Sequence, residues 1–322
     1  MLKNFLEDLD LNDCHVRAPK RIVLVCGGPV GEGGSDLRSM RDAFYRIPIN
    51  PYLGGAEPIQ AEELTREYTA NIAQTYNDIL RFESDFAQIC ALVILFCESE
   101  GSLAELGAFA LDEEISKKIF VVIRSSYYTD DSFIKLGPLK RIEEIDPQAV
   151  FAVDDDDIGL DSAICSHRKP HLINKGIDVG SLKELIGPSI AEKMEKCNDP
   201  TTLNTTRNGH FIKVLVGLIQ EFGCLTLEEI NNSMKQLFDL DDRPVKQLIL
   251  CATSARWIQE HRKGNRVFYF NSNDLEDDAV NFRFKEGSGI EKKKLRRRAS
   301  IMEHWREHDV NRHRSITAHR GK

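Results

Sequence analysis

The chain has 322 residues and a formal net charge of −8 at pH 7, and 41% of its residues are hydrophobic. Two globular domains with an appendage are therefore expected. The longest fully apolar run, residues 89–97, is far shorter than the roughly 20 residues that span a bilayer, and the acidic N-terminus lacks the apolar core of a secretory signal. We therefore expect a protein without a membrane segment.

The eight cysteines form no CxxC pair, and several lie within apolar runs. Reduced cysteines in such places behave as small hydrophobic side chains, which is typical of a protein of the reducing cytoplasm. Cys165, His167 and His171 are the nearest approach to a metal site, but no fourth ligand lies at a suitable spacing. We expect a polar loop there and no bound metal.

In chain order, the first predicted element is a strand at residues 21–30, a β-branched apolar run that ends in glycines. A glycine-rich loop follows, and a helix is predicted to open at Ser35 or Asp36. Residues 61–89 have helical spacing and contain no proline, which predicts a second helical segment.

Two further apolar runs, at residues 91–97 and 119–123, predict buried strands on either side of a helix at residues 103–118. Strands that alternate with helices imply an α/β fold with a doubly wound parallel sheet, whose ligands bind beyond the carboxyl ends of the strands. We expect this domain to occupy residues 1–150.

Residues 151–207 carry a weaker pattern. The four successive aspartates at residues 154–157 offer oxygen ligands of the kind that Mg²⁺ or Ca²⁺ binds, but a solvated turn is the more ordinary role of such a run. Glycines and prolines then interrupt weakly helical stretches. We expect peripheral elements and a linker here.

Residues 208–275 predict a small second domain. The expected elements are helices at 211–222, 226–238 and 241–253 and strands at 255–261 and 266–270. Thr226 and Glu229 have the spacing of a capping box. Three helices followed by a hairpin are the outline of a winged helix, in which the third helix enters a DNA groove while Lys263 and Arg266 of the wing contact the backbone. A winged helix used only for protein contacts is the alternative.

The remaining residues, 276–322, are expected to form a basic tail. From residue 283 onward 13 basic side chains stand against 5 acidic ones, a balance of +8, so the preceding residues carry −16. The densest part of the tail comprises Lys292, Lys293, Lys294, Arg296, Arg297 and Arg298. Like charges repel and seldom pack into a core, so the tail is expected to be solvated, to contact the acidic part of its own chain, or to bind nucleic acid.

Two places at strand ends concentrate chemically useful residues. The first is Gly27, Gly28 and Pro29, where the backbone can approach a phosphate or a sugar before a helix whose N-terminus favours anions. The spacing matches neither a Walker A loop nor a dinucleotide-binding glycine motif. Arg38, expected one turn into the helix, would bind phosphate or ribose hydroxyls; its alternative role is that of a surface arginine.

The second place follows the strand at residues 91–97. Ser102 is predicted to cap the next helix after a turn at Gly101, with Glu105 completing a capping box, so a helix cap is one role for Glu105. The other role is chemical. Glu98 and Glu105, with a third glutamate between them, gather at the crevice of the sheet, where clustered carboxylates divide the roles of nucleophile and of hydroxyl or proton binding.

The segment that begins at Glu98 reads ES-x-GS-x-AELGAF and precedes I-x-K-K-I-F-V-V. It resembles the nucleoside 2-deoxyribosyltransferase-like fold and, more narrowly, the effector proteins encoded in bacterial retrons, which are antiphage units with a reverse transcriptase, a branched RNA–DNA hybrid and a toxic effector. Supporting features are VCGGP at residues 25–29, the pair Leu37-Arg38, residues 80–83, and Ser132-Phe133-Ile134 before Gly137-Pro138. The resemblance covers residues 20–140.

The resemblance implies N-glycosidic bond chemistry. In the deoxyribosyltransferases the glutamate of the ELG motif attacks C1′ of the sugar, which maps onto Glu105, and Glu98 is the nearest counterpart of an upstream acidic residue that handles base or sugar. Ser99, Gly101 and Ser102 would line the substrate. The cationic nicotinamide of NAD⁺ leaves without much acid assistance, so NAD hydrolysis is the favoured reaction, with no cofactor; nucleosides or nucleotides are the alternative substrates.

The resemblance also implies partners. These are the retron reverse transcriptase and its branched RNA–DNA hybrid, the msDNA. Deoxyribosyltransferases complete each active site with residues from a neighbouring subunit, so at least a homodimer is expected. A hypothesis of another class is a catalytically inactive, nucleotide-sensing regulator whose winged helix reads an operator, and product formation from NAD⁺ would separate the two.

Overall fold

The computed structural model of the chain describes residues 1–31, 36–67, 75–129, 131–161, 176–197, 200–240 and 244–321. These residues fall into two compact units. We call residues 21–66 and 78–198 the α/β unit, and we call residues 1–20, 67–77 and 199–322 the helical unit.

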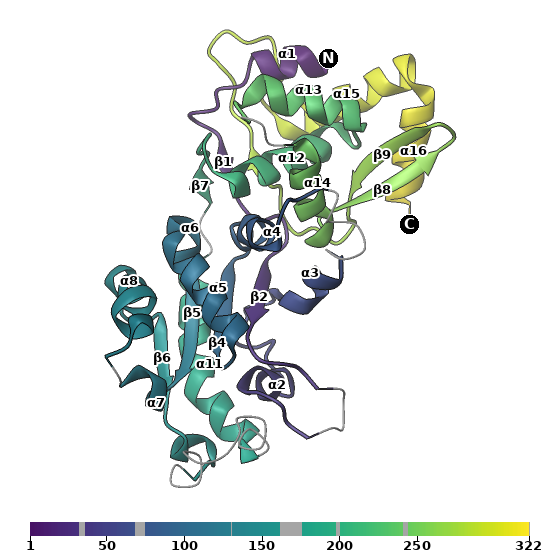
Figure 1. The fold of residues 1–322 in the computed structure, drawn as a ribbon. Helices are drawn as coiled ribbons and strands as arrows, with labels where there is room; N and C mark the ends of the chain where they lie inside the picture. The colour runs from purple at the N-terminus through teal and green to yellow at the C-terminus, as the bar shows by residue number, and fades with distance from the viewer. Residues whose placement is uncertain are drawn as a thin grey trace. The chain divides into compact units, whose positions relative to one another are not determined.

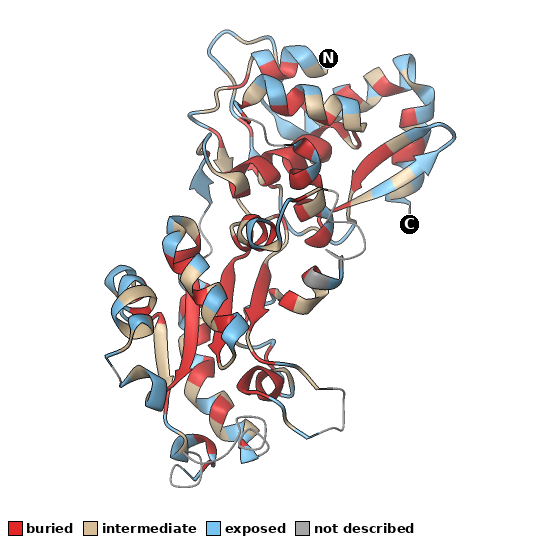
Figure 2. Ribbon diagram, in the orientation of Figure 1, coloured by how far each residue is buried: buried red, intermediate tan, exposed pale blue. Residues whose placement is uncertain are grey.

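A five-stranded parallel sheet forms the centre of the α/β unit, which confirms the α/β class and the parallel sheet of the prediction (Figure 1). In spatial order its strands are β3 (Glu57–Gln60), β2 (Ile22–Cys26), β4 (Leu92–Cys97), β5 (Ile119–Arg124) and β6 (Val150–Val153). Every residue of β2, β4 and β5 is buried, as their apolar runs predict (Figure 2). The direction of winding reverses between β2 and β4, and a sheet of this kind binds ligands in the crevice beyond that point.

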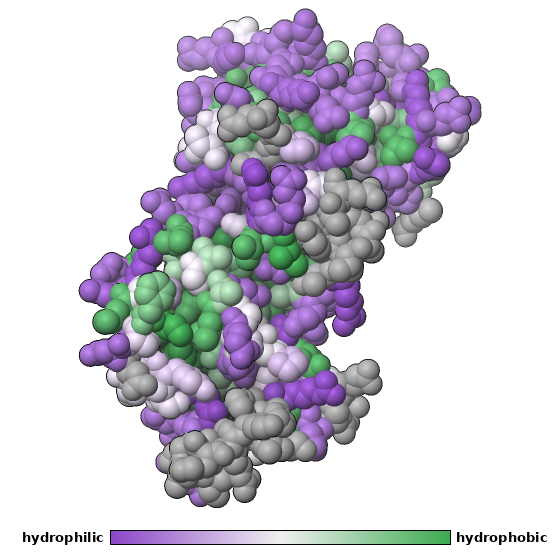
Figure 3. All heavy atoms as spheres, viewed as in Figure 1, coloured by the Kyte–Doolittle hydropathy of each residue, from purple (hydrophilic) through white to green (hydrophobic). Residues whose placement is uncertain are grey.

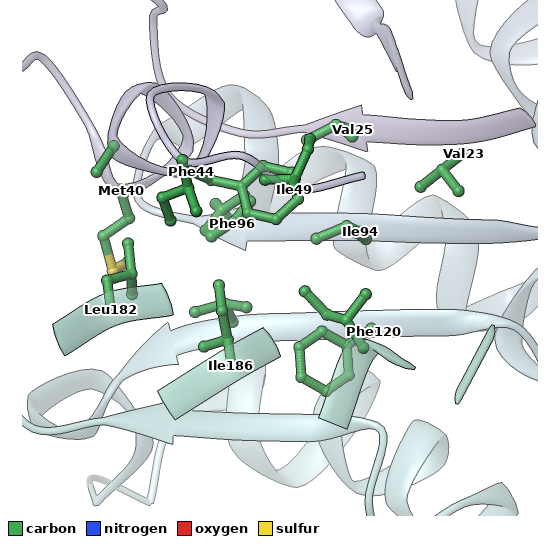
Figure 4. Close-up of a cluster of buried hydrophobic side chains, with 14 of the residues drawn as sticks. Val23, Val25, Met40, Phe44, Ile49, Ile94, Phe96, Phe120, Leu182 and Ile186 are labelled. Atoms are coloured by element: carbon green, nitrogen blue, oxygen red, sulfur yellow. The ribbon is translucent and has the colours of Figure 1, made fainter. Parts of the chain in front are cut away.

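Helices cover both faces of this sheet. They are α2 (Met40–Tyr45), α3 (Ala61–Glu67), α4 (Ile79–Ala87), α5 (Glu100–Leu111), α6 (Glu113–Ser116), α7 (Ser125–Tyr128), α8 (Lys140–Ile145) and α11 (Val179–Lys196). Figure 4 shows Phe44 of α2 and Ile186 of α11 packed against Phe96 and Phe120 of the strands. Because side chains alternate along a strand, the neighbouring residues of β2 and β4 point to the opposite face, where α5 lies (Figure 1).

The structure corrects the start of the first predicted helix. This helix begins at Met40, after the N-cap Ser39, and not at Asp36. The Oγ of Ser39 accepts a hydrogen bond from the N–H of Asp42 at 2.8 Å, which fixes the cap at that position. Arg38 therefore precedes the helix instead of lying one turn inside it.

Two other predicted helices of this unit are each divided in the structure. The predicted helical segment at residues 61–89 is divided between α3 and α4, and the helix at residues 103–118 is divided at Asp112, whose side chain caps α6. Residues 151–207 are not only a linker, because α11 buries Leu182 and Ile186 in the core and thereby completes the α/β unit.

The helical unit contains the expected three helices and hairpin. Its helices are α1 (Leu2–Glu7), α12 (Asn208–Phe222), α13 (Leu227–Leu237), α14 (Val245–Ser254), α15 (Lys294–His308) and α16 (Val310–Arg320). The hairpin pairs β8 (Ile258–Lys263) with β9 (Arg266–Asn271), and a small antiparallel sheet joins β1 (His15–Val16), β7 (Thr201–Thr202) and β10 (Val280–Asn281). Thr226 and Glu229 form the predicted capping box.

The two ends of the chain meet within this unit. The ring of Phe5 packs edge-on at 5.2 Å against both Phe222 and Phe282, and β1 pairs with β7 and β10. Residues 1–20 therefore pack with the C-terminal part of the chain, whereas the sequence groups them with the α/β domain.

Residues 276–322 are a folded part of the helical unit and not a solvated tail. Ile301, Trp305 and Ile316 are buried, and the Trp305 ring nitrogen donates to the carbonyl oxygen of Phe222 at 3.0 Å, at the C-terminus of α12. The buried apolar side chains of α15 and α16 stabilise this packing. Part of the basic run is paired with carboxylates of the same unit, which reduces the repulsion between its like charges.

Candidate active site

The predicted strand-end site lies beyond the carboxyl ends of β2 and β4, at the switch point of the sheet. Gly27 has a φ of +143°, and a Cβ there would lie 2.7 Å from the Cβ of Phe96. A Cβ on Gly28 would lie 2.8 Å from Ser39 and 2.9 Å from Oε1 of Glu98. The packing of the loop itself therefore requires glycine at both positions.

Glu98 is held by backbone N–H groups on three sides. Its Oε2 accepts a hydrogen bond from Met40 at 2.8 Å, and its Oε1 accepts from Arg41 at 3.1 Å and from Gly28 at 3.3 Å. Burial raises the pKa of Glu98 above its ordinary value, although these three hydrogen bonds oppose the shift. The carboxyl thus joins the glycine loop to the first turn of α2, which is a positioning role.

The N-terminus of α5 differs from the predicted one. Ser99 is the N-cap, its Oγ accepts from the N–H of Ser102 at 3.2 Å, and the hydroxyl of Ser102 accepts from the N–H of Ser99 at 3.0 Å. The helix begins one turn earlier than predicted, so Gly101 lies within its first turn. The predicted cap at Ser102, with Glu105 completing a capping box, is wrong.

Glu105 lies in the second turn of α5. Its Oε2 is buried and has no hydrogen-bond partner among the described residues. Burial raises the pKa of Glu105 to about 8; the negative charges of Glu83 and Glu62 add to this shift and Arg41 opposes it. Buried polar atoms in folded proteins are nearly always hydrogen-bonded, so an unsatisfied carboxyl oxygen indicates a ligand site.

The charged groups around Glu105 are functional candidates that the sequence reasoning missed. Arg41 of α2 is fully buried, and its Nη1 donates to Oε2 of Glu62 at 2.8 Å. Burial and the charge of Glu62 raise the pKa of Glu83 to about 7. These side chains come from α2, α3 and α4, which no sequence spacing brings together. The one available signal was the resemblance motif at residues 80–83, which includes Glu83.

A cleft of about 470 Å³ opens beside Glu98. Five of the predicted site residues line it, namely Gly28, Pro29, Arg38, Glu98 and Ser99. Part of the remaining lining is apolar and comes from Leu103, Ile123, Tyr127 and Ile134. Gly27, Gly101 and Ser102 are not among the described residues that line the cleft. The cleft therefore combines an arginine and hydroxyl groups with an apolar wall that suits a planar ring.

Glu105 is not among the described residues that line this cleft. Cys97, which lines the cleft, links the two, because burial and the negative charges of Glu105 and Glu98 raise the pKa of its thiol. Burial raises the pKa of Cys26 well above its ordinary value too, and the charge of Glu105 is the next contribution. The carboxyl of Glu105 is therefore close to the ends of both β2 and β4.

The residues that are predicted to bind nucleic acid differ in exposure and in pairing. On the hairpin, Lys263 is exposed, and Arg266 pairs with Asp309 at 3.0 Å. In the basic run, Lys292, Lys293 and Arg296 are exposed.

The other half of the basic run is neutralised within the helical unit. Arg297 is buried and pairs with Glu221 at 2.5 Å, and Arg298 pairs with Glu221 at 3.1 Å and with Asp278 at 2.9 Å. Lys294 also pairs with Asp278. This contact with acidic residues of its own chain is one of the alternatives that the sequence left open.

The sequence offers two groups of candidate metal ligands, a cysteine–histidine group and an aspartate run. Cys165, His167 and His171 lie outside the described residues. In the aspartate run, Asp155 accepts a hydrogen bond from Nε of Arg124 at 2.6 Å. Within the described ranges, no three acidic, histidine or cysteine residues are grouped to hold a metal ion, and no helix is long and apolar enough to cross a membrane.

The fold and the site define an α/β protein with a carboxylate site at the strand ends, joined to a helical unit that carries a hairpin. A family model described as the STM3845 retron effector protein matches residues 37–263, and the chain belongs to this family. The predicted kinship with retron effectors is confirmed.

Two Escherichia coli proteins are distant relatives. The chain is 27% identical over 130 residues to the retron Ec73 putative ribosyltransferase/DNA-binding protein, which covers 40% of each sequence. It is 26% identical over 161 residues to the retron Ec86 putative ribosyltransferase/DNA-binding protein, which covers 48% of this chain and 49% of that protein. The chain thus spans less than half the length of the curated relatives that it matches.

Proposed function

We propose that the α/β unit hydrolyses NAD⁺ to nicotinamide and ADP-ribose, and that Glu105 attacks C1′ of the nicotinamide ribose. The observation that carries this proposal is the buried Oε2 of Glu105, which no described residue satisfies, close to the carboxyl ends of β2 and β4. The printed names of the two relatives, which include ribosyltransferase, support the same class of bond.

The charges around Glu105 favour a cationic substrate. Among the described residues, the charge of Arg41 lowers the pKa of Glu105, and the charges of the two carboxyls of Glu83 and Glu62 raise it. At neutral pH the raised pKa keeps much of Glu105 protonated in the free protein. A pyridinium ring beside the cluster lowers this pKa, so the attacking carboxylate forms when the substrate binds.

The proposed reaction has two steps. A carboxylate oxygen of Glu105 bonds to C1′ while the C1′–N bond breaks, and the electron pair of that bond neutralises the pyridinium nitrogen, so nicotinamide leaves uncharged. Water then attacks C1′, which releases ADP-ribose and one proton and restores the carboxylate. In this scheme Glu98 holds the loop, and Arg38 binds a phosphate of the substrate.

As a member of a retron effector family, the chain is associated with a retron system. We further propose that the helical unit attaches it to the reverse transcriptase and to the branched RNA–DNA hybrid, the msDNA, in a complex that restrains its activity. The relatives' names include DNA-binding, which supports a nucleic-acid partner. We also expect at least a homodimer, which light scattering at assay concentration would test.

The test is product analysis with the purified chain, alone and with its reverse transcriptase and hybrid. Each sample is mixed with NAD⁺ or with deoxynucleosides, and released nicotinamide or free base is measured by chromatography. Nicotinamide release is expected from NAD⁺. Free base from deoxynucleosides with NAD⁺ untouched would replace NAD hydrolysis by nucleoside cleavage, and no product from either substrate would favour the inactive regulator.

A further inference from the structure

Helix α16 and the β8–β9 hairpin form one surface of the helical unit (Figure 1). Near the end of the helix, Nε2 of His319 lies 2.8 Å from the carbonyl oxygen of Asn271, and its ring centroid lies 4.6 Å from that of Phe270. At the start of the helix, Arg266 pairs with Asp309 at 3.0 Å. These contacts hold α16 along the length of β9.

Arg312 anchors α16 from its buried side. Its Nη2 donates to Oε1 of Glu229 at 2.7 Å, and its guanidinium carbon lies 4.2 Å from the ring centroid of Trp305 and 5.6 Å from that of Phe268. The side chain is buried, so this arginine holds the surface together and is not part of its outer charge.

A groove of about 140 Å³ runs between the hairpin and α16. Arg262 and Lys263 are the cations that line it from the hairpin, beside His261, Phe268 and Phe270. Ser315, Ala318 and His319 line it from the helix. Arg314, next to Ser315, is exposed as well. None of these three cations forms an ion pair within the part of the chain that the structure describes. The groove therefore presents positive charge that the unit leaves unneutralised.

Negative charge is scarce around this groove. The sequence of α16 contains three arginines and no carboxylate, and the hairpin strands contain one, Glu260, which accepts a hydrogen bond from the hydroxyl of Tyr269 at 3.2 Å. The face that carries the hairpin and α16 is largely hydrophilic (Figure 3). The first 282 residues of the chain carry a net charge of −16. A polyanion is therefore expected to bind at this positive surface.

The surfaces that the sequence predicts for nucleic-acid binding are less suited to this role than the groove between the hairpin and α16. In α14, the expected groove-reading helix, Gln247 is buried and its side chain donates to the carbonyl oxygen of Thr75 at 2.9 Å. In α15, Arg297 and Arg298 are occupied by Glu221. Among the described residues, the groove beside the N-terminus of α15 is lined by Lys292, Lys294 and Arg297, and the last two of these are paired with carboxylates.

We infer that the groove between the hairpin and α16 binds the phosphate backbone of a nucleic acid, with Arg262 and Lys263 as its anchors and Arg314 at its edge. This inference rests on the proposed nucleic-acid partner of the helical unit and adds the surface that contacts it. The groove is smaller than the roughly 300 Å³ of the smallest ordinary ligand pockets, so it suits a phosphate group and not a base. Binding is therefore independent of base sequence.

Fluorescence anisotropy of the full chain with a labelled DNA duplex and a labelled RNA–DNA hybrid tests this assignment over a series of salt concentrations. Each phosphate contact that is lost reduces the slope of log K against log salt by about 0.9. The double variant Arg262→Gln/Lys263→Gln should therefore lower the slope by about 1.8 and weaken binding about tenfold or more at low salt. Arg314→Gln should lower the slope by about half as much.

Two further double variants have the same change of charge as Arg262→Gln/Lys263→Gln and serve as its controls. Lys117→Gln/Lys140→Gln alters two exposed cations of the α/β unit and should leave the slope unchanged. Lys292→Gln/Lys293→Gln tests the competing basic run, at the two exposed lysines that precede α15. A fall in slope for this pair with none for the hairpin pair would overturn the groove assignment alone. Wild-type protein that binds neither duplex would overturn the nucleic-acid partner as well.

Discussion

Glu98 and Glu105 follow the same strand and have opposite surroundings. Glu98 accepts hydrogen bonds from the N–H groups of Gly28, Met40 and Arg41, whereas Oε2 of Glu105 is buried with no hydrogen-bond partner among the described residues. Burial raises the pKa of both carboxyls, and in Glu98 the hydrogen bonds oppose the shift. The first carboxyl binds the loop to α2, while the second has an oxygen that no described residue satisfies.

This difference indicates which of the two carboxylates acts as the nucleophile. A group that already satisfies several donors loses those bonds if it attacks a substrate, and the loop it holds moves with it. A group that the fold leaves unsatisfied loses nothing in the free protein and gains when a cation arrives.

The largest effect is expected at Glu105. Glu105→Gln removes the attacking charge with little change in volume, so nicotinamide release should fall by about 10³-fold or more while the fold is retained. The matched control is Glu113→Gln, an exposed glutamate in the first turn of α6, which should keep wild-type activity. Wild-type activity in Glu105→Gln would return this residue to a structural role.

The next effect is expected at Arg41. Arg41→Met removes the buried cation that pairs with Glu62, and the side chain of Glu62 is 44% exposed, so water compensates for part of the loss. We expect unfolding free energy to fall by about 2–3 kcal/mol, less than for a fully buried pair. Urea denaturation measures this, and a change below about 0.5 kcal/mol would show that the ion pair does not hold the cluster.

A smaller effect is expected at Glu98. Glu98→Gln keeps one acceptor oxygen but loses the charge that strengthens three hydrogen bonds, so stability should fall by about 1–2 kcal/mol and activity only in part. Gly28→Ala should act in the same direction because its Cβ would press on Glu98. Activity lost as completely in Glu98→Gln as in Glu105→Gln, with stability unchanged, would give Glu98 the catalytic role that the sequence suggested.

The smallest effect is the pH dependence of stability. The folded-state pKa values of Glu83 and Glu105, about 7 and about 8, lie above the ordinary value of 4.5, so the folded state holds protons that the unfolded state releases. Stability from these groups is complete below pH 4.5 and is lost as the pH rises toward 8. Glu105→Gln should flatten this decline and stabilise the protein at pH 8 by about 1–2 kcal/mol, which melting curves at several pH values would show.

The central strands of the fold are readable in the sequence, and the edge strands are not. β2, β4 and β5 are buried along their whole length, and their apolar runs predict them. β3 and β6 have only four residues each and are partly exposed, and the edge strand β3 contains Pro58. Short edge strands carry no periodic apolar signal and tolerate proline, so sequence patterns overlook them.

The candidate site could also be predicted only in part from the sequence. The position of Glu105 after a buried strand was predictable, but Ser99 and Ser102 have equivalent capping chemistry, and only the folded turn selects Ser99. The partners of Glu105 lie on separate helices, so its raised pKa depends on tertiary structure. In the basic run, Arg297 is neutralised by Glu221, a residue far away in the sequence.

The most direct test of the central claim is to trap the attacking residue. The full chain, with its restraint released, is incubated with an NAD⁺ analogue that carries fluorine at C2′ of the nicotinamide ribose, because the fluorine slows breakdown of a glycosyl–enzyme bond. Peptide mass spectrometry then locates the adduct. If Glu105 is the nucleophile, nicotinamide is released and a fluorinated ADP-ribosyl group is found on Glu105. An adduct on another residue, or nicotinamide release with Glu105 unmodified, would contradict it.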